Sequence, residues 1–331
     1  MKRFIPYSLI ATALACGLAS AQTTAYTTPV GYTSQDLFQG FNCTGLTLQS
    51  PTVVAGAFSA VAGTLLTDAS VTYAPVAGRM YVLEIISGSQ STVIQEVPAA
   101  SISGNTITTP DNLGVLGLLP GDKYKLRLAP TLEEIFTTKT LSAGGVLVAG
   151  LSSTGADVVW VPTGTGAYTK YFLHSTSSAF RLAGTSTPTP NIPVVYADGL
   201  LIEKKGSASA SLVVAGEVKT IGTKSVLVQG FNLMGAVSPV GLNLSNAGIQ
   251  GAVTPGLSAT GADNVWIQQP DLSYIKYFLR NNGAWRTSTV AVDLTPSQVA
   301  AINISNGFFI ERKALGQTTL NLNVPTGYSS L

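Results

Sequence analysis

Residues 153–161, STGADVVWV, and residues 259–267, ATGADNVWI, are two versions of one segment, 106 positions apart. The hexapeptides YTKYFL at 168–173 and YIKYFL at 274–279 repeat at the same spacing. In each copy a turn containing Gly leads into a short run of branched and aromatic residues, and a second such run follows. Runs of this kind, bounded by turn residues, are typical of β-strands. These segments therefore predict an antiparallel β structure that occurs twice in the chain.

The similarity extends on both sides of these segments. Downstream, LIEKK at 201–205 matches FIERK at 309–313, and upstream the tetrapeptide QGFN occurs at 39–42 and again at 229–232. Between this tetrapeptide and the Thr-Gly-Ala-Asp motif lie 111 residues in the first copy but only 27 in the second. The excess has the size of a small domain, so an insertion in the first copy is predicted.

We therefore predict an all-β fold made of two related antiparallel β domains, each sandwich-like or barrel-like. The first domain would comprise residues 22–56 and 139–216, and the second would comprise residues 217–331. A small β-barrel over residues 57–138 would interrupt the first domain. Within that insertion, KYKLRL at 123–128 alternates charged and apolar residues. This alternation predicts a half-buried strand that exposes Lys123, Lys125 and Arg127 to water.

Only two short helices are expected. TLEEIF at 131–136 begins with Thr131 and has Glu134 three residues later, which is a capping-box pattern. TPSQVA at 295–300 has Pro296 at the first helical position. Neither segment is long enough to change the fold class.

Residues 1–21 have the order of a secretory signal peptide. Lys2 and Arg3 are followed by an apolar stretch over residues 4–18 and by the A-x-A cleavage motif Ala19-Ser20-Ala21. Cleavage before Cys16, which would leave a lipidated cysteine, is the alternative. We therefore expect an exported protein, located in the periplasm, on the outer surface or outside the cell. No later apolar run is long enough for a transmembrane helix.

Composition excludes several function classes. Only 10% of the residues are charged, and without Lys2 and Arg3 the chain has 16 basic and 16 acidic residues, so no basic face for nucleic acid is expected. One His and two Cys cannot build a multi-His metal site or a zinc knuckle. We therefore predict no metal and no cofactor. After signal cleavage Cys43 is the lone cysteine, and burial is the simpler interpretation, with pairing between chains as the alternative.

The polar residues that could catalyse a reaction have simpler structural interpretations. His174 is the only histidine, and its counterpart in the second copy is Arg280 at the end of the same strand pattern. Asp157 and Asp263 occupy equivalent Thr-Gly-Ala-Asp positions without a second carboxylate beside them, so turn formation is favoured over acid–base chemistry. We therefore predict no catalytic residue and a protein that is not an enzyme.

Aromatic residues are the candidates for a binding surface. Trp160, Trp266 and Trp285 could stack on sugar rings, with Tyr168 and Tyr274 close to the first two in sequence. Packing in the core is the competing interpretation for all of them. Exposure of the tryptophan side chains would decide between the two.

The motifs together resemble a known family. They are Thr28-Pro29-Val30-Gly31-Tyr32 after the signal, YVLEIISG at 81–88, GDKY at 121–124, and the repeated Gly-Ala-Asp-x-Val-Trp and Tyr-x-Lys-Tyr-Phe elements. In this order they resemble an uncharacterised paralogous family of secreted proteins found in Verrucomicrobia and Planctomycetes. This chain departs from the family pattern at Phe180, where Trp is usual before Arg. The resemblance implies export and a β-rich fold, and it implies no activity.

The function expected first is that of an exported, non-enzymatic structural or interaction protein of the cell envelope or cell surface. Its expected partners are further copies of itself, cell-envelope components or glycans. The resemblance of residues 324–329 to residues 29–34 makes strand exchange between copies one form of self-association. A carbohydrate-binding module that uses Trp and Tyr is one alternative, and a carboxylate-dependent hydrolase is another.

Overall fold

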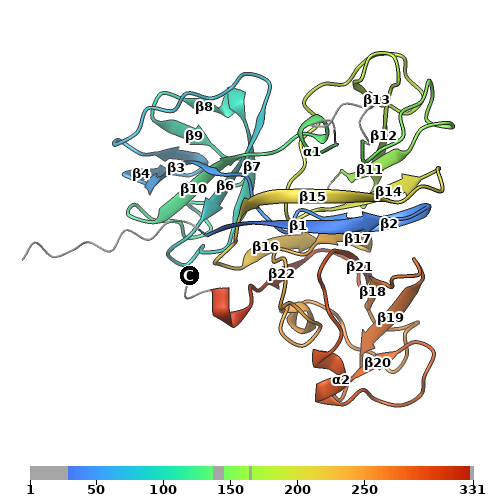
Figure 1. Cartoon of the computed structure of the whole chain (residues 1–331). Coiled ribbons are helices and arrows are strands. Elements are labelled where there is room, and N and C mark those ends of the chain that lie inside the picture. Colours follow the sequence, from blue (N-terminus) through green and yellow to red (C-terminus); the bar gives the residue numbers. More distant parts are fainter. Residues whose placement is uncertain (1–28, 137–144, 164–165, 329–331) are drawn as a thin grey trace, which may run out of the picture.

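The computed structural model describes residues 29–136, 145–163 and 166–328, which are built almost entirely of β-strands (Figure 1). The strands form antiparallel sheets, and the only α-helices in these ranges are two short ones. The predicted all-β fold class is therefore confirmed. The predicted signal peptide, the lipidation alternative at Cys16 and the predicted domain boundary at residue 139 lie outside the described residues.

Two five-stranded sheets have the same strand order, β13-β12-β11-β14-β2 in one and β20-β19-β18-β21-β17 in the other. The strands of the first sheet are β2 (Gly40–Gly45), β11 (Val158–Pro162), β12 (Tyr168–Leu173), β13 (Phe180–Leu182) and β14 (Gly199–Lys204). Those of the second are β17 (Gly230–Gly235), β18 (Asn264–Gln268), β19 (Tyr274–Leu279), β20 (Trp285–Thr287) and β21 (Gly307–Arg312). Each matching pair of sequence segments therefore occupies the same place in its own sheet.

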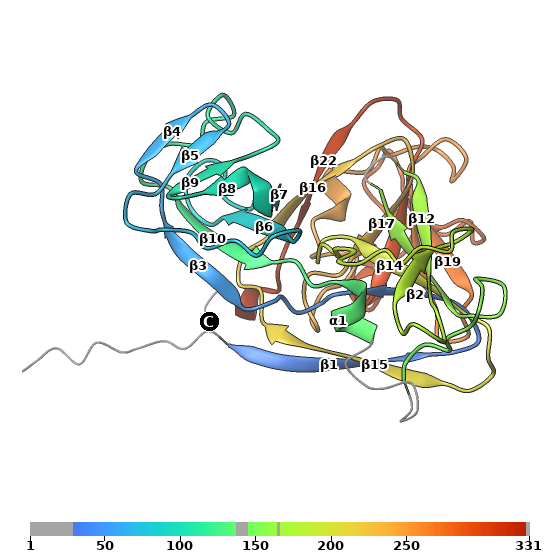
Figure 2. The same ribbon diagram turned by 90° about the horizontal axis from the view of Figure 1, so that it is seen from above.

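A two-stranded ribbon accompanies each sheet. In one ribbon β1 (Val30–Leu37) pairs with β15 (Ala210–Glu217), and in the other β16 (Thr223–Leu227) pairs with β22 (Thr318–Leu322). We call β1, β2 and β11–β15 the first half, and β16–β22 the second half. Seen from above, the β1–β15 ribbon runs along one side of the molecule (Figure 2).

Two buried asparagines hold the turn before β2 and the turn before β17 in the same way. The Asn42 side chain accepts a hydrogen bond from Phe38 N at 2.8 Å and donates to Phe38 O at 2.7 Å. Asn232 makes the equivalent bonds with the amide and carbonyl of Val228 at 2.9 and 2.8 Å. Because the amide side chain satisfies backbone groups that the turn leaves unpaired, the recurrence of Asn in QGFN has a structural cause.

Four glycines allow the two halves to pack against each other. Gly45 and Gly199 face each other across β2 and β14, and Gly235 and Gly307 do so across β17 and β21. A Cβ atom on Gly45 would lie 2.8 Å from the Gly235 Cα, and one on Gly307 would lie 2.5 Å from the Thr44 carbonyl oxygen. The two strand pairs therefore approach so closely that no side chain fits between their backbones.

An inserted module follows β2 in the chain and forms two four-stranded sheets. One has the order β3-β10-β6-β7, with β3 (Thr52–Ala57), β6 (Met80–Ile85), β7 (Ile94–Pro98) and β10 (Lys123–Leu128). The other has the order β4-β5-β9-β8, with β4 (Ala60–Ala62), β5 (Leu65–Thr67), β8 (Ile102–Ser103) and β9 (Thr106–Thr108). The module buries its own apolar cluster, including Phe58, Leu83 and Tyr124, apart from the main core. Its closure into a barrel stays a prediction.

The side-chain pattern predicted for β10 is wrong at one position. Lys123 is exposed and Lys125 is half-buried, but Arg127 is only 3% exposed. Alternation showed correctly which side chains of β10 share a face. At Arg127, however, that face is covered by β15 of the first half and is not exposed to solvent. The charge of Arg127 is therefore buried, and its partners are described below.

Both predicted helices are present with their caps. In α1 (Leu132–Phe136) the Glu134 carboxylate accepts a hydrogen bond from Thr131 N at 2.9 Å, and Glu134 N donates to Thr131 Oγ1 at 3.2 Å. α2 (Pro296–Ala300) has the equivalent capping box between Thr295 and Gln298. Local chemistry was sufficient to predict these two elements.

Candidate functional site

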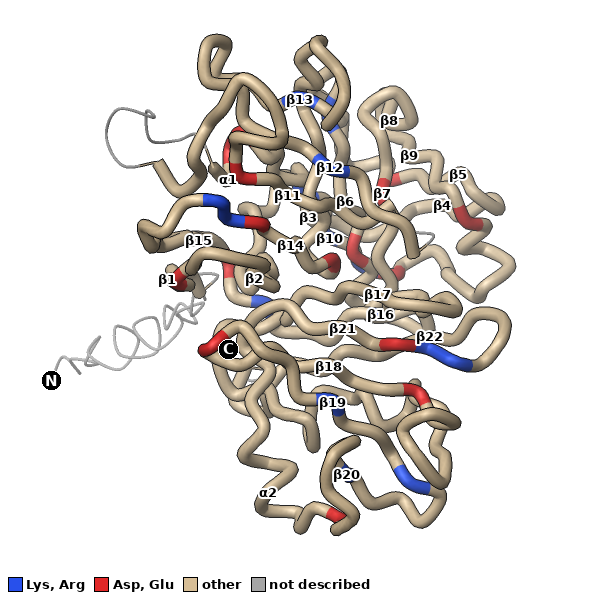
Figure 3. Tube along the Cα trace, turned by 90° about the vertical axis from the view of Figure 1, so that its right-hand side faces the viewer, with Lys and Arg blue, Asp and Glu red and all other residues tan. Residues whose placement is uncertain are grey.

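An aromatic groove lies where the two five-stranded sheets meet. It has a volume of about 360 Å³ and is lined almost entirely by apolar atoms. Its lining comes from both halves and consists of Phe41, Trp160, Leu201, Phe231, Trp266, Tyr274 and Phe309. Three of the predicted binding residues are therefore brought together on one surface, and Figure 3 shows the strands that carry them, with β12 and β19 on opposite sides.

Strand register explains why these side chains share a face. Leu201 on β14 pairs with Trp160 on β11, which pairs with Lys170 on β12. In the second half Phe309 pairs with Trp266, which pairs with Lys276. Residues that are directly opposite in an antiparallel sheet point to the same side. Each half therefore presents a row made of an apolar residue, a tryptophan and a lysine.

The rings of the groove contact one another in edge-to-face and tilted arrangements. Phe41 lies 6.0 Å from Trp160 between ring centroids, and Phe231 lies 5.7 Å from Trp266. In the second half Tyr274 adds contacts to Trp266 at 6.5 Å and to Phe309 at 5.9 Å. Such pairs stabilise one another, so the groove is a preformed surface and not a loose set of side chains.

A lysine lies over each tryptophan ring. Lys170 Nζ is 3.9 Å from the centroid of the Trp160 ring, and Lys276 Nζ is 4.1 Å from that of Trp266. Neither lysine forms a salt bridge with a carboxylate of the described residues, whereas Lys205 and Lys313 pair with Glu203 and Glu311. The groove is therefore flanked by two lysines without a salt bridge, although the charge of Lys276 also acts on the nearby Glu311 carboxylate.

The two halves differ in whether the indole N–H of the groove tryptophan has a hydrogen-bond partner. Trp266 Nε1 donates to Glu311 Oε2 at 3.1 Å. Trp160 Nε1 is buried and has no hydrogen-bond partner within the described residues. Burial raises the pKa of Glu311, but its hydrogen bonds from Lys313 and Trp266 outweigh this and hold the pKa below its ordinary value. The carboxylate therefore stays charged beside the groove.

Hydrogen bonds cross between the halves beside the groove. Tyr168 is half-buried, and its hydroxyl donates to the Phe231 carbonyl at 3.2 Å. On the opposite side, Gln268 Nε2 donates to the Phe41 carbonyl at 2.7 Å and its Oε1 accepts from Cys43 N at 2.7 Å. Each half therefore donates a side-chain hydrogen bond to the backbone of an exposed phenylalanine in the other half: Phe231 in the second half and Phe41 in the first. Burial raises the pKa of Tyr168 to about 12, so it stays a donor at neutral pH.

The remaining predicted binding residue, Trp285, lies elsewhere. It is 3% exposed and packs in the main core. Sequence reasoning missed Phe41, Phe231 and Phe309, although each lies in a segment that recurs in the chain. The repeated Phe in QGFN was a usable signal, because an apolar residue beside a buried Asn on a short strand points to the other face.

Asp157 and Asp263 have structural roles. Asp157 accepts hydrogen bonds from the backbone of Val148 at 2.8 Å and of Lys205 at 2.7 Å, and it pairs with the buried Lys204 at 3.2 Å. Asp263 accepts equivalent backbone bonds at 2.8 and 2.6 Å. Each carboxylate is almost completely buried and joins two backbone segments that are distant in sequence, so its role is structural, although it is not the local turn that was predicted.

His174 and Cys43 have ordinary surroundings. His174 follows β12, and its Nδ1 lies 3.2 Å from Ser177 Oγ. Cys43 is a buried free cysteine, as the simpler interpretation predicted, and burial raises the pKa of its thiol strongly. A thiol in this state is not a nucleophile.

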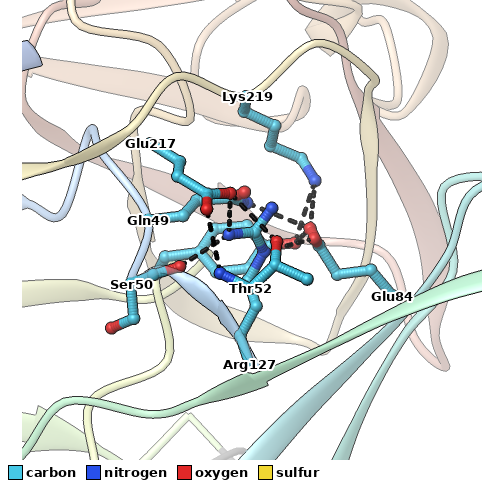
Figure 4. Close-up of polar contacts among 8 residues, drawn as sticks. Gln49, Ser50, Thr52, Glu84, Arg127, Glu217 and Lys219 are labelled. Atoms are coloured by element: carbon cyan, nitrogen blue, oxygen red, sulfur yellow. Dashed lines mark hydrogen bonds and ion pairs between the residues drawn. The ribbon is translucent and has the colours of Figure 1, made fainter. Parts of the chain in front are cut away.

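A buried ion network joins the inserted module to the first half (Figure 4). Arg127 contacts Glu84 of β6 at 2.7 Å and Glu217 of β15 at 2.5 Å, and Lys219 contacts Glu84 at 2.5 Å. Tyr196 adds a hydrogen bond to Glu84 at 2.7 Å. Every charge has an opposite partner, which is the condition under which buried charges are tolerated.

The pKa directions agree with this pairing. Burial raises the pKa of Glu84, but the positive charges of Lys219 and Arg127 outweigh it and leave the pKa far below its ordinary value. Burial lowers the pKa of Lys219, and the Glu84 carboxylate reverses only part of that effect. Sequence reasoning missed this network because its members come from four separate segments.

No protein-family model matches the chain, and searches of curated proteins and of solved structures return no match. The family resemblance drawn from the motifs stays a prediction. In the part of the chain that the structure describes, none of the helices has the length and apolar character needed to cross a membrane.

Proposed function

We propose that the protein is an exported, non-enzymatic interaction protein of the cell envelope or cell surface, and that it binds a partner protein at the aromatic groove. One observation carries this proposal: both halves contribute equivalent aromatic side chains to a single exposed apolar surface. Phe41 is 43% exposed and Phe231 is 42% exposed. The predicted signal peptide and the low charge of the chain support the location.

An exposed apolar cluster of this kind is better explained as a binding surface for a partner than as part of the core of the protein. An apolar side chain left in water forgoes about 25 cal/mol for each Å² that could be buried. Contiguous apolar patches on soluble proteins commonly mark interaction sites. The groove is also held in shape by hydrogen bonds from Tyr168 and Gln268 across the halves, so little order is lost when a partner binds.

The chemistry of the partner follows from the lining. The groove offers almost no polar atoms, so the segment that enters it must be apolar. Lys170 and Lys276 flank it and form no salt bridge with a described carboxylate, although Lys276 also acts on the charge of Glu311. The best complement is therefore a protein segment whose apolar or aromatic side chains are followed by Asp or Glu.

A glycan is the second candidate, because Trp160, Trp266 and Tyr274 do gather on one surface. Two features weigh against it. The ammonium groups of Lys170 and Lys276 lie over the tryptophan rings on which a sugar would stack. Sugar hydroxyls also need hydrogen-bond partners, which this lining lacks.

The test places a photo-crosslinking amino acid at position 41 in the full chain, expressed in the native cell. A matched chain carries the crosslinker at Leu315, which is 82% exposed and outside the groove. We expect a discrete protein adduct from position 41 only, and its loss when Phe231→Ser is added. Equal adducts from both positions, or none from position 41, would contradict the proposal. Binding of oligosaccharides that Trp266→Ala abolishes would favour the glycan instead.

A further inference from the structure

A second cleft, which shares no lining residue with the aromatic groove, lies between β1–β2 of the first half and β18–β19 of the second. Its volume is about 570 Å³, within the range of small-molecule sites. Residues 301–308, the approach to β21, form one wall. We call it the amide cleft, because six amide side chains line it: Gln35, Asn42, Gln268, Gln269, Asn303 and Asn306.

Part of this lining is committed to the fold. Asn42 is used by its own turn, Gln268 is bonded to the backbone of Phe41 and Cys43, and Gln35 Nε2 donates to the Cys43 carbonyl at 3.0 Å. These bonds fix the shape of the cleft. Because these three amide groups already bond the backbone, they are not the side chains that would form the main bonds to a ligand.

The opposite wall is uncommitted. Asn303 and Ser305 are exposed and Asn306 is half-buried, and their side chains make no hydrogen bond to any other described residue, although the backbone carbonyl of Asn306 accepts from Ala236 N at 3.0 Å. Each amide can donate and accept at once, which matches the two roles of a hydroxyl group. Asp36 is the only charged side chain of the lining, and Ser211 donates to it.

An aromatic ring completes the cleft. Phe38 lines it and is 44% exposed, whereas Tyr277 and Phe308 lie buried at its floor. A sugar ring has one apolar face of C–H groups and a rim of hydroxyls, so it needs an aromatic surface beside amide groups. Both are present here within one cavity.

The equivalent cleft of the first half shows that the fold does not require this lining. That cleft has a volume of about 480 Å³ and contains Glu96, Asp111, Asp198 and Lys224. Asp198 precedes Gly199 at the start of β14, as Asn306 precedes Gly307 at the start of β21. At this matching position an ionisable Asp198 in the first half is replaced by the amide Asn306 in the second, whereas Glu96 and Asp111 come from the inserted module.

We propose that the amide cleft binds an uncharged segment of carbohydrate, with Phe38 stacking on a ring and Asn303 and Asn306 bonding its hydroxyls. The lining disfavours phosphate and carboxylate ligands, because it offers no positive side chain and its one charged residue is the Asp36 carboxylate. This site is separate from the aromatic groove and does not depend on the function proposed for it.

The test uses the full exported chain and a panel of short uncharged oligosaccharides built from glucose, galactose, mannose, xylose or N-acetylglucosamine. Binding is measured by calorimetry. For the members that bind, Asn303→Ala, Asn306→Asp and Phe38→Ala should each raise the dissociation constant about tenfold or more. Ser305→Trp, at an exposed position on the wall, should block the cleft without removing a bond of the fold.

Two control variants separate the sites. Lys224→Ala in the cleft of the first half and Phe41→Ser in the aromatic groove should leave sugar binding unchanged. The proposal is overturned if no member of the panel binds. It is equally overturned if Phe41→Ser abolishes binding while the variants of the amide cleft do not.

Discussion

The two halves of the molecule share their strand order but differ in their polar chemistry. Both have a buried Asn in QGFN, a buried Asp directly before β11 or β18 and a pair of glycines at their contact. Only the first half carries the inserted module and shares the buried ion network with it, and the amide cleft, which both halves line, has its wall of free amides in the second half. Side chains that hold the backbone therefore agree between the halves, whereas those that face cavities or a neighbouring module have diverged.

Arg127→Met should have the largest effect, because it removes the charge that lies between Glu84 and Glu217. Breaking a buried ion pair from one side costs about 3–5 kcal/mol, since the remaining charges stay buried. Lys125→Met, on the same strand at a half-buried position, is the control and should cost much less. Denaturant unfolding would measure both. Equal losses would show that the network does not hold the module to the first half.

The two clefts differ at one matching position, which is Asp198 in the first and Asn306 in the second, and the pH dependence of stability tests this difference. Burial and the neighbouring Glu96 raise its pKa from 3.8 to about 7. The folded protein thus holds this proton more tightly than the unfolded chain, so the stabilisation is present at low pH and is lost as the pH rises from about 4 to about 7.

Asp198→Asn should remove the pH dependence of stability that Asp198 causes, because Asn, like Asn306 at the matching position of the second half, has no titratable group. The stability of the wild type relative to the variant should fall by up to about 1.4 kcal/mol per pH unit in this window. Chemical unfolding at a series of pH values measures it. Glu96→Gln should reduce the slope only in part, and a difference that does not change with pH would rule out the raised pKa.

Gly307→Ala tests the contact between the halves. Its new Cβ would lie 2.5 Å from the Thr44 carbonyl oxygen, so backbone must move, at a cost of about 1–3 kcal/mol. Gly261→Ala has nothing within 4 Å of its Cβ and is the control. Thermal unfolding should separate the two variants. If Gly307→Ala is as stable as Gly261→Ala, the close approach of the halves is not needed.

The smallest effect is expected at the two tryptophans of the groove. Trp266→Phe loses the hydrogen bond to the charged Glu311, which is worth about 1.5 kcal/mol, whereas Trp160→Phe removes an indole N–H that has no partner among the described residues. The first variant should therefore be the less stable of the two. Unfolding in urea measures the pair, and the opposite order would show that the two rows are not equivalent in packing.

Local sequence patterns predicted the helices and strands better than they predicted which side chains are buried by distant segments. The capping patterns at Thr131 and Thr295 and the strands around Trp160 and Trp266 follow from neighbouring residues alone. The exposure of Arg127 was predicted wrongly by the same logic. Alternation tells which side chains share a face of a strand, but it does not tell which faces a distant segment will cover.

By itself, the sequence determined that the chain is a β protein and that segments such as those around Trp160 and Trp266 occur twice in it. Turn residues, capping boxes and side-chain alternation act over a few residues, so they can be read along the chain. Only the tertiary structure decided that Phe41 joins Trp266 in one groove, that Arg127 is buried, and that amides from both halves line one cleft. Those outcomes depend on contacts between segments that lie far apart in sequence, where the packing of whole sheets outweighs local preference.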